Sequence, residues 1–199
     1  MPLEFNFGSV APAKNKPLEG SSFFFAMIPP VQTKTKILLA GERFRQSHRL
    51  IGSRVDVDRL HMALCPLGRA ERLRKPVESA LLEAAAEVRV APFEIVLDSA
   101  MRFSSSQDGH YPFVLCADDA SGKSLARLRR AIAEAQYRAG LYVPGVSHFL
   151  PHITLLYGYL IGSVQESIPP IAWLAREFVL IRSYFGYLRH EIIGRWPLS

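Results

Sequence analysis

Two side chains near the C-terminal end of the chain, His152 and Thr154, have the types and the spacing that phosphate chemistry requires. They lie two residues apart in the run PHITLLYG at residues 151–158, whose apolar content indicates a β-strand. Because successive side chains of a strand point to opposite faces, these two share one face. That face would present an imidazole with a pKa near neutrality and a hydroxyl that can bind an oxyanion.

A second histidine, His61, lies in a similar run, LHMALC at residues 60–65, in which Ala63 takes the place that Thr154 has in the later run. Threonine is rare in this chain, with three residues in all. A His-x-Thr match is therefore uncommon by chance, and the related second run adds weight to it. The two runs together predict one site built from both histidines.

The secondary structure expected around the two histidines repeats. An apolar strand, a helix and a histidine-bearing strand follow one another twice, and each half of the chain also has a strand hairpin. A further helix has apolar residues at helical spacing with charges between them. The expected strands are residues 23–28, 55–65, 93–103, 111–117, 151–157, 178–185 and 187–193, and the expected helices are residues 31–46, 73–88 and 122–139, the last with Ser121 as its N-cap.

This order predicts two pseudo-symmetric lobes whose histidine strands lie side by side across a central cleft, a usual location for a ligand. Residues 22–199 would form this single bilobal domain. Residues 1–21 are rich in proline, glycine and asparagine, and they predict an extended arm rather than a targeting helix.

The composition is that of an ordinary globular protein, and its charge suits an anionic partner. Of 199 residues, 49% are hydrophobic and 21% are charged, which is enough for one good core. The net charge of +6 and the pI near 9.5 fit RNA or a phosphorylated small molecule, although a merely basic surface gives the same values. Cys65 and Cys116 lie in apolar runs and predict reduced, buried thiols. With no secretory signal and no membrane-spanning run, we expect a soluble, cytoplasmic monomer.

Two histidines that face one cleft suit a reaction that needs a base and an acid together. At neutral pH one imidazole can be neutral while the other is protonated. Opening a strained cyclic phosphate has this demand, because one ring deprotonates water and the other protonates the departing ribose oxygen, while Thr154 donates to a non-bridging oxygen. The reaction requires no metal. A zinc site at His148 and His152 is disfavoured, because their segment is not helical and a third ligand is missing.

These residues resemble the motifs of the 2H phosphoesterase superfamily. Within it, the nearest group is the 2′-5′ RNA ligase family, whose members also act as RNA 2′,3′-cyclic phosphodiesterases. The run FFFAMIP at residues 23–29 is similar to that family's first strand, and PHITL at residues 151–155 is similar to its second motif. The resemblance covers about residues 22–199 and implies an α+β fold in which each lobe is a small antiparallel sheet packed on helices.

The resemblance implies that His61 and His152 are the catalytic pair, that Thr154 binds phosphate, and that hydrolysis needs no cofactor. Ala63 departs from the family pattern, which has Thr or Ser there, and a missing hydroxyl can weaken transition-state binding by on the order of a few kcal/mol. Three interpretations stay open. They are a phosphodiesterase that opens 2′,3′-cyclic phosphates of RNA ends, with or without 2′-5′ ligase activity; a hydrolase of a small cyclic-phosphate nucleotide or sugar; and a catalytically weakened RNA-binding module.

Arginines are concentrated in the helix expected after Ser121, at Arg127, Arg129, Arg130 and Arg138. Such a run is typical of a solvated helix face, and it also fits a track for the RNA backbone. Arg138 is the strongest candidate among them for a phosphate-binding residue, because it lies at the helix end that leads into the loop before the His152 strand.

Overall fold

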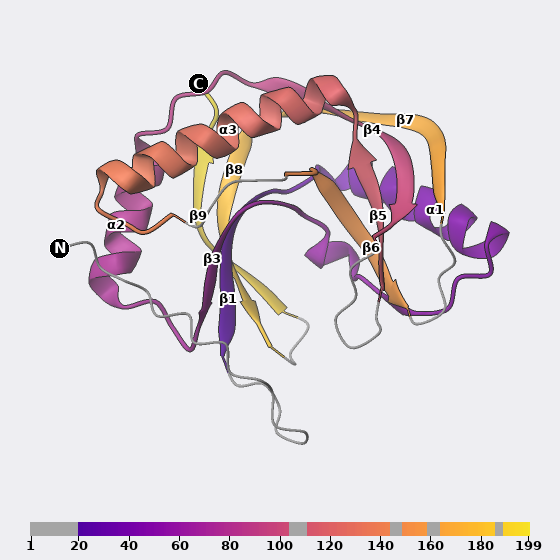
Figure 1. The fold of residues 1–199 in the computed structure, drawn as a ribbon, viewed down its shortest axis with the longest axis horizontal. Helices are drawn as coiled ribbons and strands as arrows, with labels where there is room; N and C mark the ends of the chain where they lie inside the picture. Colours follow the sequence, from indigo (N-terminus) through magenta and orange to yellow (C-terminus); the bar gives the residue numbers. More distant parts are fainter. Residues whose placement is uncertain (1–19, 104–110, 144–148, 159–163, 186–188) are drawn as a thin grey trace.

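The computed structural model describes residues 20–103, 111–143, 149–158, 164–185 and 189–199, which form two antiparallel β-sheets and three α-helices (Figure 1). The strand orders are β3-β1-β8-β9 and β2-β6-β5-β4-β7. The first sheet contains β1 (Ser21–Met27), β3 (Met62–Ala70), β8 (Glu177–Tyr184) and β9 (Arg189–Pro197). The second contains β2 (Ser53–Arg54), β4 (Phe93–Arg102), β5 (Tyr111–Ala117), β6 (His152–Gly158) and β7 (Gln165–Ala175). The expected α+β fold with two lobes is therefore confirmed.

The helices are α1 (Val31–Ser47), α2 (Lys75–Ala86) and α3 (Asp119–Arg138), and the short 3-10 helix η1 (Val57–Arg59) precedes β3. The N-cap of α3 is Asp118, whose carboxylate accepts a hydrogen bond of 2.8 Å from the backbone N–H of Ser121. The prediction that Ser121 is the cap is wrong. Its hydroxyl instead accepts a 2.8 Å bond from the N–H of Val96, so it ties the first turn of α3 to β4.

The two lobes exchange parts. The C-terminal hairpin of β8 and β9 completes the N-terminal sheet, because β1 pairs with β3 on one side and with β8 on the other. The helices are exchanged as well: α1, which follows β1, packs on the five-stranded sheet, and α3, which follows β5, contacts β3 and α2 (Figure 1). Each lobe is thus built from both halves of the chain.

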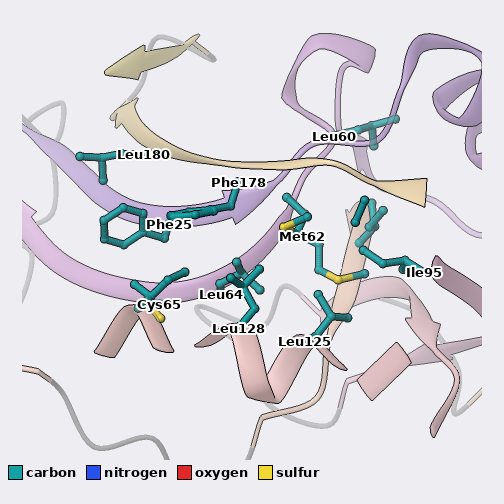
Figure 2. Packing of buried hydrophobic residues seen from close by; sticks show 14 of the residues in the cluster. Phe25, Leu60, Met62, Leu64, Cys65, Ile95, Leu125, Leu128, Phe178 and Leu180 are labelled. Carbon is teal, nitrogen blue, oxygen red and sulfur yellow. The ribbon is translucent and has the colours of Figure 1, made fainter. Parts of the chain in front are cut away.

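The hydrophobic core of the four-stranded sheet lies against α3 (Figure 2). Alternate residues of β1 point into it, so that Phe25 is fully buried and its ring centroid lies 6.0 Å from that of Phe178 in β8. Leu125 and Leu128 of α3 are also fully buried there. Cys65 is buried beside them and donates through Sγ to the backbone oxygen of Arg129, 3.7 Å away. Burial raises the pKa of this thiol to about 11, so it is a packing residue, as predicted.

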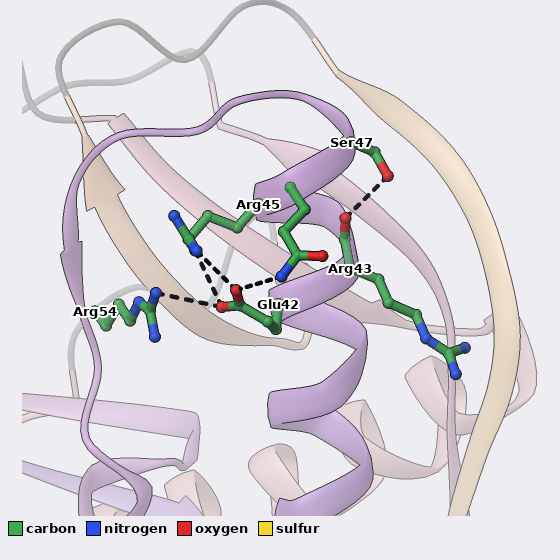
Figure 3. A network of polar contacts seen from close by, with 6 residues as sticks. Glu42, Arg43, Arg45, Ser47 and Arg54 are labelled. Atoms are coloured by element: carbon green, nitrogen blue, oxygen red, sulfur yellow. Dashed lines mark hydrogen bonds and ion pairs between the residues drawn. The ribbon is translucent and has the colours of Figure 1, made fainter.

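A polar network ties α1 to β2 at the outer side of the second sheet (Figure 3). The Glu42 carboxylate accepts from Nη2 of Arg45 at 2.7 Å and pairs with Arg54 of β2 at 3.3 Å. These partners hold the pKa of Glu42 at about 2. The network borders a pocket of about 380 Å³ whose lining includes Leu39 and Leu155, and which lies between α1 and β6.

Two strand predictions differ from the structure. The run at residues 55–65 is not one strand, because η1 occupies Val57–Arg59, and β3 begins at Met62 and continues through Pro66 and Gly68 to Ala70. Proline is tolerated there because β3 is an edge strand. The strand β7 was missed because it contains Pro169 and Pro170. It too is an edge strand, and its pairing with β4 is interrupted at those prolines.

The predicted N-terminal arm lies largely outside the described residues, as does His148. Of the arginines expected on a solvated face, Arg127, Arg130 and Arg138 are exposed. Arg129 is buried, and its guanidinium lies 4.7 Å from the ring centroid of Phe149. Among the helices that the structure describes, none has the length and hydropathy needed to cross a membrane.

Candidate active site

His61 is held at the junction between η1 and β3. The chain leaves η1 at Arg59, and the ring of His61 turns back so that its Nδ1 lies 2.7 Å from the backbone oxygen of Arg59. A carbonyl oxygen only accepts, so Nδ1 carries the proton and donates. The Nε2 atom of the neutral ring then has a free lone pair, which is what a general base needs.

His152 is held in the same way at the start of β6. Its Nδ1 lies 2.8 Å from the backbone oxygen of Leu150, which is again the residue two positions before the histidine. The two imidazoles therefore have the same tautomer, with Nδ1 donating to the backbone and Nε2 available for chemistry.

The two histidine strands have the same irregularity at the same offset. On β3 the pairing with β1 skips Leu64, and on β6 the pairing with β5 skips Leu155. Each skipped leucine lies three residues after its histidine. A bulge at this point sharpens the twist of the strand, so the repeat extends to the backbone path of both motifs. On β3, Cys65, just after the bulge, is buried on the α3 side, whereas Ala63, just before it, is exposed.

The structure brings the two histidine strands together. β3 and β6 are in contact, although they belong to different sheets. The histidines also influence one another electrostatically, because a positive charge on His152 lowers the pKa of His61. The prediction that the histidine strands lie side by side is therefore confirmed.

Burial favours the neutral form of both rings, and nearby cations add to this effect at His61. Burial lowers the pKa of His61 to about 4, against the opposing effect of the Arg59 carbonyl, and the charges of Arg59, His152 and Lys34 lower it further. Burial also lowers the pKa of His152, while the Leu150 carbonyl raises it. The site is thus positive and partly desolvated, which suits a phosphate ligand.

Thr154 lies two residues after His152 on β6, between the buried side chains of Ile153 and Leu155. Its side chain is partly exposed, so it shares the face of His152, as the alternation predicts. Among the described residues no hydrogen bond engages its hydroxyl. Ala63 has the corresponding place on β3, opposite Ala26 of β1, so that side of the site has methyl groups where a hydroxyl could be.

Arg138 is not brought to the histidines. The start of α3 lies next to the His152 strand, because Ala117 donates its backbone N–H to the oxygen of Pro151. Arg138 is the last residue of this 20-residue helix. At a rise of 1.5 Å per residue it lies about 28 Å along the axis from the first residue. The exposed Arg138 side chain is therefore at the far end of the helix.

Sequence reasoning missed the aromatic side chains around the two rings. The ring of Phe24 lies 4.8 Å from that of His61, and the ring of Phe103 lies 4.6 Å from that of His152. A third histidine, His190 of β9, lies 5.0 Å from His61. The run at residues 23–28 contains Phe24, but the alternation of β1 only indicates that it faces away from the core. Among the described residues, no group of three or more His, Cys, Asp or Glu side chains could hold a metal ion.

β3, which follows His61, is in contact with β6, which begins at His152, and the two histidines have matched tautomers and matched bulges, as expected of a bilobal phosphoesterase of the two-histidine type. The model of the 2′-5′ RNA ligase superfamily matches residues 37–184, and the chain belongs to that family. The crystal structure of Escherichia coli LigT in apo form is 27% identical, with a TM-score of 0.68, and the match covers 91% of this chain and 99% of that one.

Other solved structures agree with this assignment. LigT complexed with 3′-AMP is 27% identical, with a TM-score of 0.70, over 91% of this chain and 99% of LigT. The protein TT0787 of Thermus thermophilus is 20% identical, with a TM-score of 0.67, over 89% of this chain and 97% of that one, and it shares the fold. No curated protein sequence matches the chain.

Proposed function

We propose that this chain is a metal-independent phosphodiesterase that opens the 2′,3′-cyclic phosphates of RNA ends or related nucleotides. One observation carries the proposal: His61 and His152 each donate Nδ1–H to the carbonyl two residues back, at 2.7 and 2.8 Å, so both Nε2 atoms are available for proton transfer. A pair of imidazoles close enough to influence one another can hold one proton between them, and this state contains both a base and an acid.

In the proposed reaction, the neutral imidazole takes a proton from water as the oxygen attacks phosphorus. A new P–O bond forms, the bond from phosphorus to one ribose oxygen breaks, and the protonated imidazole gives its Nε2 proton to that oxygen. The product is a phosphomonoester, and the pair has exchanged the positions of its proton. The Thr154 hydroxyl donates to a non-bridging oxygen and stabilises the charge that develops there.

The family supports a nucleotide substrate. Crystals of Escherichia coli LigT contain 3′-AMP, ATP or phosphate, and the +6 net charge of this chain favours anionic ligands. Joining of RNA ends through a 2′-5′ linkage is the reverse of an analogous phosphoryl transfer. We propose it as a second activity of the same two histidines.

The test compares turnover of a short RNA with a 2′,3′-cyclic phosphate end and of a cyclic mononucleotide. We expect wild-type protein to hydrolyse the cyclic phosphate in the presence of EDTA. His61→Ala and His152→Ala should each lose at least about 100-fold in rate, because each imidazole contributes on the order of 10²–10⁴-fold.

Three results would redirect the proposal. Activity that EDTA abolishes, or that survives both substitutions, would remove the two-histidine mechanism. Preference for the mononucleotide would favour a small cyclic phosphate as substrate. Salt-sensitive RNA binding without turnover would favour the RNA-binding module that Ala63 suggests. A variant away from the site, Lys75→Ala at the exposed start of α2, serves as the matched control.

A further inference from the structure

His190 is a third imidazole at the site, contributed by the edge strand of the four-stranded sheet. Its ring centroid lies 5.0 Å from that of His61, with the two planes at 70°, and 5.9 Å from that of Phe24. The strand β9 also contacts η1, which holds the carbonyl that orients His61. The ring contact places His190 itself beside the first histidine, and β9 as a whole also packs near it.

The ring nitrogens of His190 have no hydrogen-bond or ion-pair partner among the described residues, although the ring is partly buried. A partly buried polar group without a partner is costly unless a ligand or water satisfies it. The surrounding charges are positive: those of His61, Arg59 and Lys34 all act on His190 and lower its pKa, after burial, to about 4. An anion is the ligand that such a setting favours.

Ala63 explains why this part of the site needs another donor. On β6 the hydroxyl of Thr154 stands two residues after its histidine, whereas on β3 the corresponding side chain is a methyl group. Its cross-strand neighbour Ala26 is also a methyl group. Neither residue can donate to an oxyanion. His190, whose ring lies 5.0 Å from that of His61, has an N–H that could serve as this donor.

We propose that His190 is a phosphate-binding residue of this site, whose imidazole N–H donates to a phosphate oxygen of the substrate and so replaces the hydroxyl missing at Ala63. Neutral imidazole has one N–H donor and can therefore make this bond without being protonated. Rings 5.0 Å apart are close enough for one phosphate to contact both His61 and His190. This inference rests on the proposed function, because it assigns a further contact to the same phosphate.

The first experiment uses the wild-type protein, so it does not depend on any variant that folds. Inorganic phosphate, and separately a 2′-phosphomononucleotide, is titrated while the ring signals of the histidines are followed by NMR. We expect the signals of His61, His152 and His190 to move together along one binding curve, while His48, which pairs with Glu166 of β7, stays unchanged. If the first two move and His190 does not, the inference fails and the proposed function stands. If none of the three histidine signals moves and no turnover is found, both the inference and the proposed function fail.

The second experiment is a double-mutant cycle. His190→Phe keeps the ring and its packing but removes the donor, and we expect kcat/KM and phosphate affinity to fall about 10- to 100-fold, the range for a hydrogen bond to a charged group. Ala63→Thr should restore most of this loss in the His190→Phe background, yet add little to wild type. His190→Gln, which keeps an N–H donor, should retain more activity than His190→Phe.

Any of three results would count against the assignment. One is wild-type kcat/KM in folded His190→Phe, as judged by an unchanged circular dichroism spectrum. Another is that Ala63→Thr raises kcat/KM by the same factor in wild type and in His190→Phe, because sites that do not interact give additive effects. Loss of activity that is equal in the Phe and Gln variants would also count against a donor role.

Discussion

At the scale of single residues, the backbone decides what each histidine can do. In both motifs the carbonyl two positions before the histidine accepts from Nδ1, so the chemistry falls to Nε2. The spacing of His152 and Thr154 in the sequence predicted a shared face. It did not predict the tautomer, because that depends on the carbonyls of Arg59 and Leu150, which the turn before each strand directs inward.

The lowered pKa values predict an acidic optimum. Burial moves both imidazoles below the ordinary value of 6.5, His61 to about 4. As pH rises, the imidazole that acts as the acid loses its proton, and activity falls. As pH drops toward about 4, the imidazole that acts as the base becomes protonated, and activity falls again. We expect kcat/KM, which reports the free enzyme, to peak between about pH 4 and 6.5 and to fall toward pH 8.

This profile is measured with the cyclic mononucleotide at substrate concentrations well below KM. The two limbs belong to the coupled pair rather than to single residues. A plateau that extends unchanged from pH 6 to 8 would contradict the expectation, since it would require an acid whose pKa is raised well above the ordinary value.

Thr154 should matter through its hydroxyl alone. Thr154→Val keeps the shape of the side chain, so β6 should fold as before, but it removes the donor to the phosphate. We expect kcat to fall by about 10²- to 10³-fold, as for loss of one oxyanion donor. Thr154→Ser, which keeps the hydroxyl, should lose far less. Equal losses in the two variants would indicate a packing role instead.

At the scale of elements, alternation and turn residues predicted most of the strands and all three helices. Two of the misses, the far end of β3 and the whole of β7, share a physical cause. Proline in β3 and β7 argued against a strand, but both strands are edges, where a missing N–H breaks no ladder. Whether a strand is an edge depends on the whole sheet, and local sequence does not contain that information.

The pairing of β2 with β6 depends on one glycine. A Cβ at Gly52, just before β2, would lie 2.3 Å from the backbone oxygen of Tyr157, so β2 would have to move away from β6. At Gly122 in α3, a Cβ would meet only Pro151, at 4.0 Å. Gly52→Ala should therefore lower the free energy of unfolding by about 1–3 kcal/mol, whereas Gly122→Ala should raise it by about 0.5–1 kcal/mol.

Urea unfolding of the two variants beside wild type measures both changes. The matched pair separates the effect of contact from that of glycine itself, because each variant adds one methyl group. Stabilisation by Gly52→Ala would mean that β2 can shift without loss of its pairing to β6.

At the scale of the whole molecule, the sequence repeat predicted two lobes but not the exchange of helices and strands between them. The repeat describes local order, strand–helix–strand, and each copy is found as β1-α1-β3 and β5-α3-β6. Which sheet each hairpin joins depends on pairing between segments far apart in the chain. The contact of His190 with His61 has the same origin, because it joins a C-terminal edge strand to an N-terminal motif across a twisted sheet.

Because the C-terminal hairpin completes the N-terminal sheet, the chain order also sets the order in which the protein can assemble during synthesis. β1 is an interior strand whose partner on one side, β8, begins only at Glu177. While the ribosome is still making the middle of the chain, Phe24 and Phe25 have no β8 or β9 to cover them, and one edge of β1 is unpaired. The first histidine motif emerges early, but its sheet closes only when the hairpin of β8 and β9 has been made. Long-range pairing of this kind makes folding slow and leaves an exposed edge for a chaperone to protect.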